Sequence, residues 1–223
     1  YEAYGDCARM MDLTETLVQG AALAVSGKPA GRLGGREVDL TRPWPRLRMA
    51  DEVSRLAGSD VSAWDLDAFK SAFGKKANLA VCRDPGEALV AVFEGLCRLD
   101  PSRPVFVTGH PVSVSPLAQR EAPGSPWADR YEVFLGDMEL ANGFSELNDP
   151  DDQRGRFAQQ ARLRAGGDEE AQPVDEEYLE ALEYGLPPTG GLGLGLDRLT
   201  MLLTGADSIR DVILFPLLKP RIT

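Results

Sequence analysis

Residues 190–199 read GGLGLGLDRL, in which glycines alternate with leucines ahead of an Asp-Arg pair. Leu192, Leu194 and Leu196 recur at every second position, which predicts a strand with one leucine face, because successive side chains of a strand point to opposite faces. The glycines leave the other face of that strand bare. Two interpretations stay open. Either a flat ligand lies on the bare backbone with Arg198 over it, or a helix packs closely across the glycines.

The common glycine-rich nucleotide fingerprints do not fit this run. A Rossmann fingerprint requires glycines at relative positions 1, 3 and 6, between a strand and a helix. Counting from Gly191 puts Leu196 at the sixth position, and counting from Gly193 puts Arg198 there. The Gly-Lys-Ser/Thr of a P-loop is also absent from the sequence. The run is therefore not typical of a phosphate-binding loop.

A second motif, DRYEVFLGDMELANGF at 129–144, predicts a β-hairpin with Gly-Asp as its two-residue turn. In a regular ladder from that turn, Phe134 faces Glu139. Glu132 then faces Ala141, and the two glutamates share one face as diagonal neighbours. Converging carboxylates repel each other unless a cation lies between them, and Mg²⁺ bound to phosphates is the usual one. The alternative is a solvated hairpin face with two unrelated glutamates.

The segment that follows the hairpin offers a possible recognition surface. Asn142, Phe144 and Glu146 alternate, so they share a face if the strand continues. An amide, an aromatic ring and a carboxylate together suit a cationic, flexible side chain. The alternative is an ordinary strand end, with capping by Asn148 and Asp149.

Composition limits the classes of function. The chain has 223 residues and a net charge of −11. This charge disfavours non-specific nucleic-acid binding by this piece, and it suits a cationic small molecule or Mg²⁺ as ligand. Three scattered cysteines without a CxxC pair indicate a reducing, cytoplasmic compartment, and no apolar run is long enough for a membrane helix. His110, the single histidine, is interpreted as a surface or strand-end residue. Because residue 1 is Tyr, we expect an excerpt of a longer chain.

Periodicity and capping signals predict the order of the elements. The section 27–99 is interpreted as a helical insertion or a layer over a sheet, with a turn region at 27–35. The predicted helices cover 6–25, 60–74, 86–99, 175–185 and 197–205. Two more helices are predicted, one from about residue 50 and one after the N-cap Asp149 with Pro150 at its first position. The predicted strands are a short one near 36–40, one near 103–116, the two strands of the hairpin, and 190–196.

Three long stretches closely resemble the C-terminal part of the catalytic domain of class II lysyl-tRNA synthetases. They are MELANGFSELNDPDDQRGRF (138–157), EALEYGLPPTGGLGLGLDRLTMLL (180–203) and SIRDVILFPLLKP (208–220). SPLAQR (115–120) and the opening YEAYGDCARMMDLTETL (1–17) resemble the same family in the same order. The resemblance covers nearly all of 1–223 and is weakest between Gly27 and Leu99.

The resemblance implies an α+β fold, the class II antiparallel sheet flanked by helices, here as a partial catalytic domain. It also implies activation of lysine by ATP and transfer to tRNA(Lys), with ATP and Mg²⁺ required and a homodimeric parent. The implied residue roles are these: Arg198 and Glu139 catalytic; Glu132 and Glu139 for Mg²⁺; Glu132, Glu139, Gly191, Gly195 and Arg198 for ATP; Tyr1, Asn142, Phe144, Glu146 and Gly193 for lysine, with Glu146 pairing the ammonium.

The sequence also departs from the family pattern. The first two class II motifs and the anticodon-binding barrel are not found in it, and VCRDPGEALVAVF (81–93) lacks a Trp-Gly-Leu-Gly-type segment. We therefore expect this chain alone to be inactive, and tRNA to be held mainly by other regions. Two alternatives stay open: a lysine ligase acting on a protein or lipid-linked acceptor, and a truncated regulatory paralogue.

Overall fold

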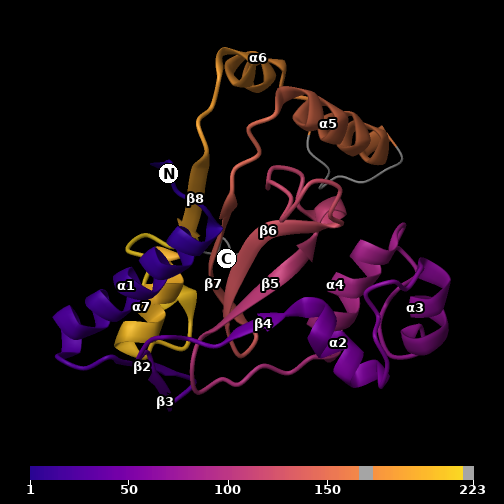
Figure 1. The fold of residues 1–223 in the computed structure, drawn as a ribbon. Coiled ribbons are helices and arrows are strands. Elements are labelled where there is room, and N and C mark those ends of the chain that lie inside the picture. The colour runs from indigo at the N-terminus through magenta and orange to yellow at the C-terminus, as the bar shows by residue number, and fades with distance from the viewer. Residues whose placement is uncertain (166–172, 218–223) are drawn as a thin grey trace, which may run out of the picture.

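A six-stranded sheet forms the centre of the computed structural model, which describes residues 1–165 and 173–217 (Figure 1). Its strand order is β1-β8-β7-β6-β5-β4, and every neighbouring pair is antiparallel except β4 and β5. The strands are β1 Glu2–Ala3, β4 Arg46–Arg48, β5 Val105–Pro111, β6 Trp127–Leu135, β7 Met138–Ser145 and β8 Thr189–Leu194. The helices lie around this sheet, so the predicted fold class is confirmed.

Two hydrophobic clusters cover the sheet. Helices α1 (Cys7–Ser26) and α7 (Leu196–Thr204) belong to the cluster that includes Tyr131, Val133 and Leu135 of β6. Helices α2 (Met49–Ala57), α3 (Leu66–Phe73) and α4 (Pro85–Leu96) form the second cluster, together with Val107 and Phe134. Because Phe134 and Val133 are consecutive in β6, the two clusters meet opposite faces of the strand.

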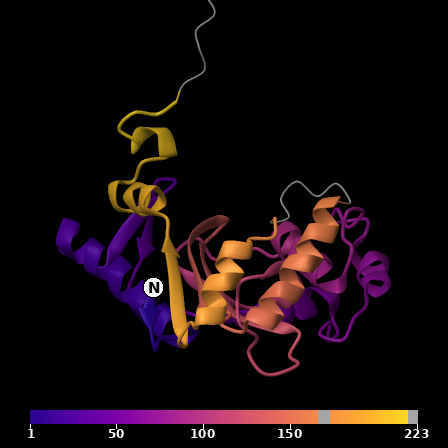
Figure 2. The same cartoon turned by 90° about the horizontal axis from the view of Figure 1, so that it is seen from above.

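Two further helices lie at the end of the sheet where β7 finishes and β8 begins. Helices α5 (Pro150–Ala165) and α6 (Glu176–Tyr184) lie side by side there, as both views show (Figure 1 and Figure 2). The Asp149 carboxylate accepts hydrogen bonds from the backbone N–H groups of Asp151 and Asp152 at 2.9 and 3.2 Å, so the predicted start of α5 is confirmed. Among the described residues, no helix combines the length and the apolar character that crossing a membrane requires.

Other boundaries differ from the prediction. The section 27–99 holds α2–α4 but also β4 and a two-stranded sheet, β2 (Ala30–Leu33) with β3 (Arg36–Asp39), so the region 27–35 is not only a turn. The helix predicted at 60–74 is confined to α3. The short 3-10 helices are Val112–Val114 and Ile209–Asp211. The last residues of the SIRDVILFPLLKP motif, 218–220, lie outside the described residues.

The glycine run forms a shorter strand than predicted. Leu192 and Leu194 pack against the first cluster, but Leu196 is 69% exposed and begins α7. The strand stops because Gly195 becomes the N-cap of that helix, and its N–H donates to the carbonyl of Leu140 at 3.0 Å. The leucine face therefore consists of two leucines, and the third was wrongly assigned to it.

Gly190 should be required for packing of α1 on β8. A Cβ atom at this position would lie 2.9 Å from both the Asp6 carbonyl oxygen and Met10 Cγ, which is too close for either to accommodate without moving. We expect Gly190→Ala to lower the free energy of unfolding by about 1–3 kcal/mol. Gly20→Ala, in the middle of α1 with nothing within 4 Å of the added atom, is the matched control. It should be neutral or stabilise by up to about 1 kcal/mol. Urea unfolding of both variants measures this, and equal effects would contradict the packing argument.

Candidate active site

The β6–β7 hairpin contains a bulge that the sequence did not reveal. Its pairing begins as predicted, with Phe134 opposite Glu139, but the register then shifts by one residue. Glu132 pairs with Asn142, and not with Ala141 as a regular ladder would require. The predicted pairing of Glu132 is wrong because Leu140 is an extra residue in β7, and both Leu140 and Ala141 turn into the core.

This bulge brings the two predicted clusters of polar residues onto one face. Glu139 and Asn142 are three positions apart, so a regular strand would point them to opposite faces. The extra residue shifts the alternation of side chains by one position, so both residues point to the same face. There, Nδ2 of Asn142 donates to Oε1 of Glu139 at 3.3 Å. Glu132 keeps the face predicted for it. The carboxylate pair and the face of Asn142 and Phe144 are therefore one continuous surface.

Strand β8 lies next to this surface and explains the glycine run. Gly191 pairs with Phe144 and Gly193 with Asn142, so their bare sides flank the polar face. Gly190 lies on the opposite side, where α1 crosses it. The interpretation that a helix packs closely across the glycines is therefore confirmed at Gly190, on one face, while the other face stays bare beside the polar residues.

Glu146 ends the polar surface in a buried position, with only 8% of its surface exposed. A Cβ atom at Gly191 would collide with the Glu146 carboxylate and would lie 3.2 Å from Cε1 of Tyr1. Gly193, in contrast, has Asn142 Oδ1 at 3.4 Å from such an atom, an ordinary contact. The glycine that makes room for the Glu146 carboxylate is thus Gly191, which the sequence had assigned to ATP.

The Glu146 carboxylate makes no hydrogen bond or ion pair with any residue that the structure describes. Burial raises its pKa to about 7. Tyr178 of α6 lies close enough that the charge of Glu146 contributes, after burial, to raising the pKa of its phenol. A buried carboxylate without a partner is unfavourable, and a cation placed against it would stabilise its charged form.

Glu132 has a different environment. Its carboxylate forms an ion pair with the Arg130 guanidinium and lies 3.3 Å from Nε2 of His110, without the alignment of a hydrogen bond. Burial acts to raise the pKa of Glu132, but His110 and Arg130 outweigh it and lower the pKa below the usual value. His110 is the second-last residue of β5, so its interpretation as a strand-end residue is confirmed, but it is only 2% exposed and therefore not a surface residue.

Glu132, Glu139 and Arg198 line a pocket of about 1220 Å³, larger than the roughly 300–1,000 Å³ of typical ligand sites. Arg198 is exposed, and its Nη1 donates to the Glu139 carbonyl at 2.6 Å while lying 3.8 Å from Oε2 of that residue. Helix α4 adds Glu94 to the lining. Partial burial, followed by the charges of Glu132 and Glu139, raises the pKa of Glu94.

The donor set suits Mg²⁺ bound jointly with phosphates. Magnesium takes oxygen ligands and is usually held by one or two carboxylates plus substrate phosphates. Glu132 and Glu139 supply two carboxylates on one face, and the lowered pKa of Glu132 keeps it ionised at neutral pH. Within residues 1–165 and 173–217, no group of three or more acidic, His or Cys side chains is arranged to hold a metal. Two carboxylates leave the remaining positions of an octahedral Mg²⁺ to phosphates and water.

Comparison with known proteins identifies the family. The model for "tRNA synthetases class II (D, K and N)" matches residues 1–219. The chain belongs to this family of class II tRNA synthetases. It is 47% identical to a lysine–tRNA ligase of Syntrophomonas wolfei and 43% identical to one of Streptococcus gordonii, covering 99% and 98% of this chain. It spans only 45% of each relative, less than half of their length.

Several site residues of this class II chain were not predictable from the sequence. Glu94, His110, Arg130 and Tyr178 approach the predicted site residues only through contacts between distant segments. For Arg130 one signal was available, since it alternates with Glu132 in β6 and so shares its face. Glu94 had no such signal, because its helix and the hairpin are far apart in the sequence.

The raised pKa of Glu146 should appear in the pH dependence of stability. Between pH about 4.5 and about 7, the folded state holds a proton on Glu146 that the unfolded chain has released, so this group makes stability fall as pH rises. Its contribution over that window is on the order of 3 kcal/mol. We expect Glu146→Gln to remove this component, so that the variant gains stability relative to wild type between pH 5 and 8. Parallel urea-unfolding profiles of the two proteins across that range would contradict the assignment.

Proposed function

We propose that this chain carries the lysine-binding and much of the ATP-binding part of a lysine–tRNA ligase. Together with regions that the relatives possess beyond the matched segment, it activates lysine to lysyl-adenylate and transfers it to tRNA(Lys). The observation that carries the proposal is the buried, unpaired Glu146 carboxylate beside the bare face of β8. It supports a substrate with a side-chain cation, and among aspartate, lysine and asparagine only lysine has one.

In the proposed reaction, the lysine carboxylate attacks the α-phosphorus of ATP, and pyrophosphate leaves. The ribose hydroxyl at the end of tRNA then attacks the acyl carbon of the adenylate, and AMP leaves. No covalent bond to the enzyme is formed, so the residues act by positioning and by charge neutralisation. Glu146 binds the ammonium, while Asn142, Phe144, Tyr1 and Gly193 line the path of the lysine chain.

The ATP end of the proposed site uses the 1220 Å³ pocket. Glu132 and Glu139 would hold Mg²⁺, which neutralises phosphate charge when bound. Arg130 and His110 orient Glu132. Arg198, anchored on the Glu139 carbonyl, is exposed beside Gly195 and suited to stack on the adenine.

The remaining parts of the proposal concern the complete ligase. We propose that tRNA contacts, a homodimer interface and the second arginine on the α-phosphate come from outside this segment, and that the ligase is cytoplasmic. The net charge of −11 supports tRNA binding by other regions, since phosphate contacts need Lys and Arg.

A hybrid ligase tests this division of labour. In it, this chain replaces the matching 45% of the Syntrophomonas wolfei relative. Lysine-dependent exchange of pyrophosphate into ATP should be strong in the hybrid and undetectable with the 223-residue chain alone. Exchange with aspartate or asparagine but not lysine would refute the lysine assignment. A hybrid that forms lysyl-adenylate yet fails to charge tRNA(Lys) would favour another acceptor.

Removal of the charge at Glu146 should weaken lysine selectively. In the hybrid, we expect Glu146→Gln to raise the KM for lysine roughly 10- to 100-fold, because a hydrogen bond between charged groups is lost. The KM for ATP should stay within about twofold, since no direct contact is lost there. Glu180→Gln on α6, exposed, is the matched control and should change neither constant. Unchanged lysine kinetics in Glu146→Gln would refute its role.

A further inference from the structure

Among the residues that the structure describes, Glu146 has no side-chain partner, so its position is set by the backbone around it. One neighbour is β8, where the Glu146 N–H donates to the Thr189 carbonyl at 2.8 Å. The other neighbour is the segment 115–120, which reads SPLAQR and lies outside the regular strands. An antiparallel bridge between Ala118 and Glu146 joins it to the end of β7. Two hydrogen bonds make this bridge, from the Gln119 N–H to the Ser145 carbonyl at 2.8 Å and from the Leu147 N–H to the Leu117 carbonyl at 3.0 Å.

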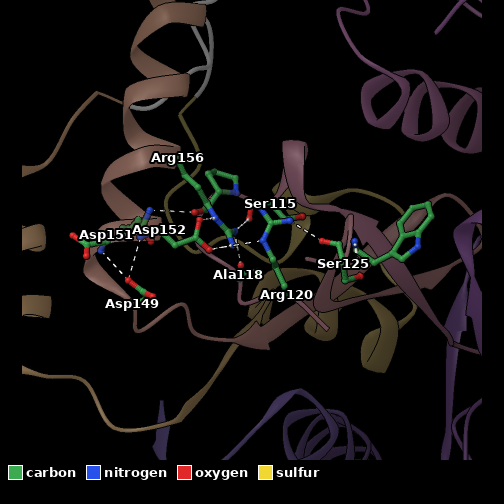
Figure 3. A network of polar contacts seen from close by, with 11 residues as sticks. Ser115, Ala118, Arg120, Ser125, Asp149, Asp151, Asp152 and Arg156 are labelled. Carbon is green, nitrogen blue, oxygen red and sulfur yellow. Dashed lines mark hydrogen bonds and ion pairs between the residues drawn. The ribbon is translucent and has the colours of Figure 1, made fainter. Parts of the chain in front are cut away.

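A buried arginine of α5 holds this segment in place (Figure 3). Arg156 is only 7% exposed, and its Nη1 donates to the carbonyls of Ser115 at 3.2 Å and Ala118 at 2.6 Å. The rest of the guanidinium forms a two-pronged pair with Asp152, with distances of 3.0 Å from Nε and 2.9 Å from Nη2. Such a fork is the geometry in which arginine binds most strongly, and the carboxylate compensates the buried charge.

Other contacts support the two ends of the segment. Gln153, also in α5, donates to the Pro116 carbonyl at 3.1 Å. Arg130, which pairs with Glu132, donates to the Val114 carbonyl and to Oγ of Ser115 at 3.1 and 3.0 Å. Arg156 is the contact at Ala118, the residue directly bridged to Glu146.

We propose that Arg156 is a positioning residue for Glu146, and through it determines how well the site selects a cationic side chain. By holding Ala118 between α5 and the end of β7, Arg156 determines the position of the Glu146 carboxylate beside Gly191. The selection of lysine in this inference rests on the proposed function. The claim that Arg156 holds the segment 115–120 against the end of β7 does not. The Glu132 and Glu139 carboxylates lie on the hairpin, which Arg156 does not contact. Arg130, which meets the segment at Ser115, is also held by the Val114 carbonyl and by Glu132, so loss of Arg156 affects lysine more than ATP.

The functional experiment compares Arg156→Met with Arg154→Met in the hybrid ligase. Arg154 lies in the same helix, is exposed, and pairs with Glu176 and Glu183 on α6, so its substitution removes the same charge without touching the segment 115–120. Arg156→Met should raise the KM for lysine on the order of tenfold and leave the KM for ATP within about twofold. Arg156→Lys, which keeps the charge but not the fork, should fall between Arg156→Met and wild type.

The structural experiment uses the 223-residue chain itself. Hydrogen exchange should show that Arg156→Met loses protection at the amides of Gln119 and Leu147, at least tenfold, while amides of the β6–β7 ladder keep theirs. Arg154→Met should match wild type at all of these positions. If Arg156→Met does not fold, Asp152→Asn serves instead, because it weakens the fork and leaves the arginine in place.

The outcomes separate the two proposals. Equal increases in the KM for lysine and ATP, or no increase in either, overturn the positioning role, as does unchanged protection of Gln119 and Leu147. A wild-type hybrid with no lysine-dependent exchange defeats the proposed function. In that case hydrogen exchange at the amides of Gln119 and Leu147 still decides whether Arg156 holds the segment 115–120.

Discussion

One extra residue in strand β7 is the constraint on which the geometry of the site depends. The bulge at Leu140 turns two consecutive side chains into the core and leaves Leu140 without a partner residue in β6, and the carbonyls of Glu139 and Leu140 lie at this break in the register. The start of α7 binds both of them, through the N–H of Gly195 and the guanidinium of Arg198. A bulge whose unpaired groups are satisfied in this way is a stable feature and not a defect. The end of the glycine run therefore holds the carboxylate hairpin in the register that the site needs.

The glycines of β8 meet two different steric demands. At Gly190 a helix lies against the strand on the core side, and at Gly191 a carboxylate occupies the space of a side chain on the opposite side. A strand that has close neighbours on both faces needs glycines at consecutive positions. A phosphate-binding loop has no such requirement. This explains why the run matches no loop fingerprint although it borders a polar pocket.

Local signals in the sequence predicted local features correctly. The Asp149 cap, the turn of the hairpin and the shared face of Glu132 and Glu139 depend on neighbouring residues or on one turn, and the structure has them. The continuation to Asn142 could not be derived, because alternation fails at a bulge and nothing in the sequence marks one at Leu140. The burial of His110 could not be derived either, since it results from helix α4 and strand β6 closing over β5.

The environment of Glu146 gives a physical basis for the selection of a cationic side chain in the proposed function. A carboxylate that is buried without a partner can be relieved in two ways, by taking up a proton or by meeting a cation. Near neutral pH the two compete, because burial brings its pKa to about 7. A substrate ammonium prevails by bringing its own charge, while a neutral side chain of the same length leaves the carboxylate unpaired. Sites built on such a buried group reject the wrong substrate far more strongly than apolar pockets do. That selectivity depends on keeping the carboxylate fixed while it has no partner. The segment 115–120 opposite it, held by hydrogen bonds from Arg156 of α5 to the Ser115 and Ala118 carbonyls, therefore belongs to the proposed site together with the carboxylate.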